Sequence, residues 1–125
     1  MKVGIDRLAD VIAEELESYS QEITDMLKTE VKQVARECRD EIRDNSPRLT
    51  GDYRKGWRTT TNYEGREDIR VTVHNKTDYQ LTHLLEDGHA IKGGTGRVEG
   101  IPHIAPAEEH AAEKLETRVK VAIRK

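Results

Sequence analysis

Apolar residues recur every three or four positions from Ile5 to about Arg43, which is the spacing of one face of an α-helix. No Pro or Gly interrupts this stretch, and Pro47 ends it, because proline disfavours helical geometry in the residue before it. The pattern predicts a long N-terminal helix within residues 1–45. Such a helix is longer than a compact 125-residue domain is wide, so we expect a bend near residues 18–20 or, as we favour, packing against a neighbouring subunit.

The pattern changes to strand-like alternation from Trp57 to Tyr63 and again from Ile69 to His74. A turn of five residues separates these two segments, which together predict a β-hairpin. Just before the hairpin, Thr50 is positioned to cap a short helical turn that ends at Gly56.

The last part of the chain predicts one short helix, one loop and one longer helix. Asp78 is the predicted cap of a short helix that ends at Gly88. Residues 88–102 contain five glycines and form a predicted loop of the kind that is functional or becomes ordered on binding. Residues 103–105 predict a short third strand, and Pro106 suits the first turn of a C-terminal helix.

These patterns predict a single α+β domain over residues 1–125 with a small antiparallel sheet. It consists of the long helix (1–45), a middle segment with the hairpin, the short helix, the glycine-rich loop and the third strand (46–105), and the C-terminal helix (106–125).

The composition predicts a domain whose own hydrophobic core is small. Hydrophobic residues are 34% of the chain and Phe is absent, whereas charged residues are 36% with a net charge of only −3. Chains of this kind often complete the burial of apolar surface against copies of themselves. We expect no membrane association, because no window approaches the length of an apolar span. The single cysteine, Cys38, falls on the apolar helical stripe, where a small buried hydrophobe is expected, and fits a reducing cytoplasm.

Acidic residues are concentrated near the N-terminus. Residues 1–30 contain 8 acids and 3 bases. This excess predicts either a solvated helix face or an acidic wall that repels a polyanion passing nearby.

The candidate chemistry in the chain is weak. The glycine-rich loop lacks the Lys-Ser/Thr pair and the following helix of a phosphate loop, and the five histidines and one cysteine have no metal-ligand spacing, so neither a cofactor nor a metal is expected. Basic residues over 48–58 lack the interleaved aromatics of a nucleic-acid platform. Glu86 with His83 or His103 could form an acid/base pair, which leaves a small metal-independent nuclease or toxin-like RNA-binding enzyme as the alternative function.

Three segments, taken in order, resemble the tailed-phage head–tail joining proteins, also described as neck, tail-component or tail-completion proteins. They read SPRLTGDYRKGW from Ser46, YQLTHLLEDGH from Tyr79 and PHIAPAEE from Pro102. The sequence LLEDGH is closest to the versions of this motif from phages and prophages of Gram-positive hosts. The motif positions are Pro47, Thr50, Gly51, Trp57, Tyr79, Leu85, Glu86, Gly88, His89, Pro102, His103 and Pro106. Asp52 and Tyr53 depart from the Arg/apolar pair that is more usual in this family.

The resemblance implies a non-enzymatic virion protein that is assembled in the bacterial host cytoplasm. Its expected form is a homo-oligomeric ring, a hexamer or dodecamer, in the neck or tail, through which double-stranded DNA passes. Its expected partners are a portal-side connector or head-closure protein and a tail terminator or tail-tube protein. In this reading Thr50 and Gly51 form the turn before the hairpin, Trp57 anchors the hairpin, and Glu86 with Gly88 closes the short helix. The loop would contact a neighbouring subunit or partner through Lys92, Gly93, Gly94 and Arg97.

Overall fold

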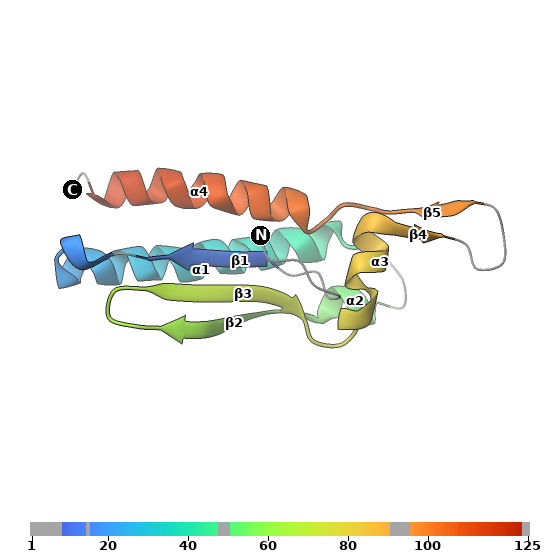
Figure 1. The fold of residues 1–125 in the computed structure, drawn as a ribbon, viewed down its shortest axis with the longest axis horizontal. Coiled ribbons are helices and arrows are strands. Elements are labelled where there is room, and N and C mark those ends of the chain that lie inside the picture. Colours follow the sequence, from blue (N-terminus) through green and yellow to red (C-terminus); the bar gives the residue numbers. More distant parts are fainter. Residues whose placement is uncertain (1–8, 15, 48–50, 91–95, 124–125) are drawn as a thin grey trace.

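The computed structural model describes residues 9–14, 16–47, 51–90 and 96–123, and confirms a mixed α+β fold (Figure 1). In chain order the elements are β1 (Ala9–Ala13), the 3₁₀ turn η1 (Leu16–Ser18), α1 (Gln21–Asn45), α2 (Asp52–Lys55), β2 (Trp57–Glu64), β3 (Ile69–Asn75), the 3₁₀ turn η2 (Tyr79–Leu81), α3 (Thr82–Asp87), β4 (Gly88–Ala90), β5 (Arg97–Glu99) and α4 (Ala105–Ile123).

The N-terminal helix is shorter than the sequence pattern predicts. It begins only after Ser20, whose Oγ accepts a hydrogen bond from the backbone N–H of Ile23 at 3.3 Å and so caps the helix. The prediction of helix over residues 9–20 is therefore wrong, because residues 9–13 form a strand and a 3₁₀ turn follows. Pairing of β1 with β3 overrides the helical spacing, which over so few residues also fits a strand whose odd-numbered positions face inward.

The main sheet has the strand order β1-β3-β2 and is antiparallel throughout. The predicted hairpin is confirmed as β2 and β3, with Trp57 opposite Asn75. The inward face of β3 carries Ile69, Val71 and Val73, all buried. The third strand of this sheet is β1, so the prediction of a third strand at residues 103–105 is wrong.

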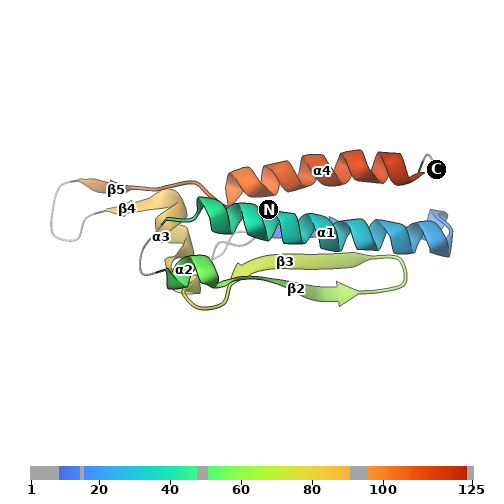
Figure 2. The same ribbon diagram turned by 180° about the vertical axis from the view of Figure 1, so that it is seen from behind.

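The glycine-rich segment contains a second, two-stranded sheet that the sequence pattern did not predict. Strands β4 and β5 pair antiparallel, with Gly88 opposite Glu99. Together with α3 they project beyond the end of the body at which α1 ends (Figures 1 and 2). We call the β4–β5 hairpin the arm.

Helix α1 lies at the centre of the fold. It packs against all three strands of the main sheet on one side and against α4 on another (Figure 1). The predicted C-terminal helix is confirmed as α4, which lies beside α1 and contacts the sheet through its edge strand β1. Cys38 is buried in this core, as expected for a small hydrophobe, and burial raises the pKa of its thiol to about 12. Trp57 is also buried and belongs to the core, as expected for a residue that anchors the hairpin.

Candidate functional site

Residues from all three motif segments meet in one buried polar cluster, which we call the junction. Its members are Ser46, Tyr53, Trp57, Glu86 and His103, all buried. The three rings lie edge to face, with centroids 5.6 Å apart for Tyr53–Trp57 and for Tyr53–His103, and 6.2 Å apart for Trp57–His103. Aromatic groups favour this arrangement because a ring edge is positive and a ring face negative.

The carboxylate of Glu86 caps the N-terminus of α4. Oε1 accepts hydrogen bonds from the backbone N–H groups of His103 and Ile104, both at 2.8 Å, and Oε2 accepts one from Ala105 at 2.9 Å. The first N–H groups of a helix have no partner within the helix and carry partial positive charge, so a buried carboxylate satisfies them and is stabilised by them. Glu86, at the end of α3, thereby joins α3 to α4.

The ionisation of Glu86 reflects this environment. Burial raises its pKa, but hydrogen bonds from the His103 side chain and from the backbone N–H groups of Ala105, His103 and Ile104 more than offset burial. They lower the pKa from 4.5 to about 2, so Glu86 is charged at neutral pH although only 3% of its surface is exposed.

His103 connects this cap to Tyr53. Its Nδ1 lies 2.6 Å from the carbonyl of Ile101 and 3.0 Å from Glu86 Oε1, and its Nε2 lies 2.6 Å from the Tyr53 hydroxyl. Burial raises the pKa of Tyr53, so the hydroxyl stays protonated and can donate a hydrogen bond to Nε2. These contacts assign the histidine tautomer with its hydrogen on Nδ1, facing two acceptors.

The other side of the junction holds the C-terminus of α1. Trp57 Nε1–H donates to Ser46 Oγ at 2.9 Å, and the Ser46 hydroxyl donates to the carbonyl of Ile42 at 2.6 Å. Arg54 Nε donates to the Ser46 carbonyl at 2.9 Å. The first motif segment thus ties the hairpin to the end of α1.

The predicted motif residues occupy different environments. The structure brings Trp57, Glu86 and His103 together, whereas His89 and Pro102 are exposed. Gly51, at φ 97°, occupies the N-cap position of α2 that was predicted for Thr50, and Gly88, at φ 79°, ends α3 as predicted. Half-buried positions are held by Pro47, Leu85 and Pro106, and the backbone of Tyr79 begins η2.

Of the residues expected to reach a neighbour, Arg97 belongs to the arm. Arg97 is exposed on β5, and its guanidinium donates to the carbonyl of Asp87 at 2.7 Å. Thr50, Lys92, Gly93 and Gly94 lie outside the described residues.

Sequence reasoning missed three residues that hold the junction. Ser46 and Tyr53 were present in the first motif segment but were not singled out as site residues. Asn75 is buried, donates to the Tyr53 carbonyl at 2.7 Å and accepts from the backbone N–H of Thr77 and Asp78. An asparagine that follows a buried strand and precedes Lys-Thr-Asp is typical of such a side-chain-capped turn, and that signal could have identified it.

The geometry gives the proposed acid/base pair a structural role. Glu86 and His103 do touch, but 3% and 1% exposure leave a substrate no access to them. His83 is half-buried, and its Nδ1 has no hydrogen-bond partner among the described residues. Within the same described ranges, no group of three or more His, Cys, Asp or Glu side chains is placed to hold a metal ion.

The fold and the junction define a small α+β protein whose buried polar residues join its segments. The chain belongs to the family described as "Bacteriophage HK97-gp10, putative tail-component", whose model matches residues 10–88. The match includes the first motif segment and the second as far as Gly88, and it ends before β5 and α4. No curated protein and no solved structure matches the chain. No helix in the described part of the chain is long and apolar enough to cross a membrane.

Proposed function

We propose that this phage tail-component protein is a ring-forming neck or tail-completion subunit, which joins the capsid and portal complex to the tail and lets double-stranded DNA pass. Family membership supports a structural component of the virion. The observation that carries the proposal is the junction. The motif residues best suited to catalysis are buried there, where they hold α1, α3 and α4 together.

The shape of the molecule supports assembly. The arm projects from the body and has exposed apolar side chains at or near its second strand, namely Val98 (45%) and Ile101 (53%). Exposed apolar side chains on a projecting segment favour contact with another subunit, as a ring requires.

Exposed carboxylates support a channel that does not retain DNA. Glu17 on η1 and Glu22 and Asp25 at the start of α1 are exposed at the end of the body opposite the arm. If this end lines the channel, repulsion between carboxylates and phosphates keeps the duplex from binding to the wall.

The ring is tested by native mass spectrometry and negative-stain images of the purified protein over a range of concentrations. We expect rings of six or twelve subunits, alone or with a portal-side connector or a tail-tube protein added. A monomer under all these conditions would contradict the proposal. Hydrolysis of RNA by such a monomer in the presence of a chelator would instead favour the nuclease.

The acidic channel is tested separately by mixing the protein with duplex DNA at low salt. We expect no tight binding. Tight binding that weakens as salt is added would show a basic channel wall.

A further inference from the structure

The three-stranded sheet stops short of the second helix. The sheet ends at β1, whose edge contacts α4, and no further strand of the described chain pairs with the outer edge of β1 (Figure 1). The helical layer therefore has two members, and the sheet layer covers only one of them fully. The space over α4 beside β1 is where a fourth strand would lie.

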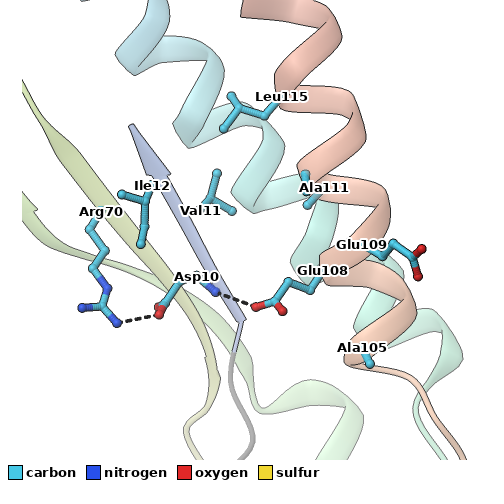
Figure 3. Close-up of a pocket in the computed structure, with 10 residues that line it drawn as sticks. Asp10, Val11, Ile12, Arg70, Ala105, Glu108, Glu109, Ala111 and Leu115 are labelled. Atoms are coloured by element: carbon cyan, nitrogen blue, oxygen red, sulfur yellow. Dashed lines mark hydrogen bonds and ion pairs between the residues drawn. The ribbon is translucent and has the colours of Figure 1, made fainter. Parts of the chain in front are cut away.

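That space is an open groove between β1 and α4. It has a volume of about 630 Å³ at the Asp10 end, and an adjoining cavity of about 550 Å³ continues it toward η1, with Ile12, Ala112 and Leu115 lining both. In Figure 3, Ala111 and Leu115 point from α4 toward β1, across the groove. Because apolar side chains line its floor, the groove favours an occupant with its own apolar side chains.

Alternate backbone groups of β1 face the groove rather than β3. The N–H of Asp10 donates away from β3, to Glu108 Oε2 at 3.3 Å (Figure 3). In an antiparallel ladder, alternate residues direct both backbone groups to the same side, so the N–H and C=O of Ile12 also face the groove. An edge strand with these outward groups pairs readily with a strand from another chain.

The chain itself carries a strand of the matching kind in the arm. Strand β5 pairs only with β4 among the described strands, and its three residues are all exposed. The base of the arm is held by the Ile101 N–H bond to the Leu85 carbonyl at 2.8 Å and by the Glu86 cap. Since the arm leaves this base pointing away from the body, it cannot reach the groove of its own subunit (Figures 1 and 2).

The side chains of β5 suit the groove. The strand carries one apolar residue, Val98, between two charged ones, Arg97 and Glu99. Because side chains alternate along a strand, Val98 can face the apolar floor of the groove while both charged groups face away from it.

We propose that β5 of one subunit adds to the main sheet of the next subunit as a fourth strand beside β1, with Val98 against Leu115 and Ala112 of α4. The contact joins different surfaces of the two copies, so repetition around an axis closes a ring rather than a two-fold dimer. The inference rests on the proposed ring and names the contact that builds it.

Cysteine pairing between two variants tests this contact in the full chain. Both variants carry Cys38→Ala, so that only the new thiols react. One has Val98→Cys and the other, with a distinguishing tag, has Ala112→Cys, and the two are mixed and oxidised. The matched control replaces Ala112→Cys with Glu113→Cys, the next residue of α4, which is exposed and does not line the groove. We expect a disulfide-linked heterodimer from Val98→Cys with Ala112→Cys, at least about five times the yield with Glu113→Cys.

Each other outcome contradicts the proposed contact. Linked pairs formed mainly between two Val98→Cys chains would show that arms pair with arms. Protection of Ala112→Cys from alkylation in the monomer would show that the groove is filled within one chain. Rings without preference for the Ala112→Cys pair would overturn the contact and leave the proposed function intact, whereas monomers throughout would overturn both.

Discussion

At the scale of single residues, Glu86 shows how one side chain can serve two elements. It is placed by α3, yet its carboxylate accepts hydrogen bonds from three backbone N–H groups at the start of α4. A carboxylate is suited to this position because it only accepts hydrogen bonds, and these three N–H groups each donate one.

Replacing Glu86 by Gln is therefore expected to cost about 2–4 kcal/mol of the free energy of unfolding. The glutamine side chain replaces one carboxylate oxygen by an NH₂ group, which cannot accept a hydrogen bond from an N–H group at the α4 N-terminus. Urea denaturation at pH 7 measures the loss. Glu109→Gln, an exposed change in the first turns of the same helix, is the matched control and should alter stability by less than about 0.5 kcal/mol.

The same residue predicts a dependence of stability on acid. The pKa of Glu86 is lowered by folding from 4.5 to about 2, so the carboxylate stabilises the fold above pH 4.5, and this contribution is lost as the pH falls toward 2. The difference corresponds to about 3 kcal/mol. Urea midpoints over pH 2–6 should fall more steeply for the natural protein than for Glu86→Gln. Parallel curves would show that Glu86 is not the group responsible.

Tyr53→Phe isolates the other end of the junction. The change removes the hydroxyl that faces His103 Nε2 at 2.6 Å and leaves a buried nitrogen without its donor, so we expect a loss of about 1–3 kcal/mol. Tyr63→Phe provides the comparison, because that hydroxyl is exposed and reaches Glu14 only at 3.5 Å. Equal thermal shifts for the two variants would argue against the buried network.

At the scale of elements, the sequence pattern identified those helices and strands that are specified by residues close together in the chain. The β2–β3 hairpin and α4 were predictable because alternation, turn residues and an uninterrupted apolar stripe each specify them locally. Strand β1 was not, because its spacing fits helix and strand alike and only pairing with Val71 and Val73, some sixty residues away, selects the strand.

The junction was predictable only in part for the same reason. Motif resemblance identified Trp57, Glu86 and His103, but not that Glu86 would cap a helix beginning near residue 105 or that Ser46 would accept the Trp57 N–H. Such contacts depend on how distant elements meet, and no spacing along the chain encodes that.

Two glycines allow the effect of backbone conformation on stability to be separated from the effect of steric clash. Gly51 and Gly88 both have positive φ, at 97° and 79°, which strains any other residue. A Cβ on Gly51 meets nothing within 4 Å, whereas one on Gly88 would clash with the backbone of Val98 and Gly100. We expect Gly51→Ala to cost about 1 kcal/mol and Gly88→Ala clearly more, with faster hydrogen exchange in β4 and β5. Similar losses in both variants would mean that the arm does not depend on this close approach.

At the scale of the whole molecule, the core is uneven. The larger buried cluster joins α1 to the main sheet and the start of α4, while a smaller one, containing Leu16, Leu27 and Ala122, lies toward the other end of the two helices. No described residue of the arm belongs to either cluster.

Hydrogen exchange in the isolated subunit should follow this distribution. We expect the slowest exchange in β3 and the middle of α1, and fast exchange in β4, β5 and the first turn of α1. Assembly should then slow exchange in the arm and in β1 together. A monomer that is uniformly protected, arm included, would contradict the expectation that the subunit completes its structure on a neighbour.

The hydrogen-bonded base of the arm has a consequence for the length of the segment that it closes. The chain leaves the body at Asp87 and returns at Ile101, and the bonds that hold this crossing are made by Leu85 and Glu86, outside the excursion itself. Lengthening an excursion whose ends are already held together costs little free energy. We therefore expect that changes in the length of the segment between these points alter the stability of the body little.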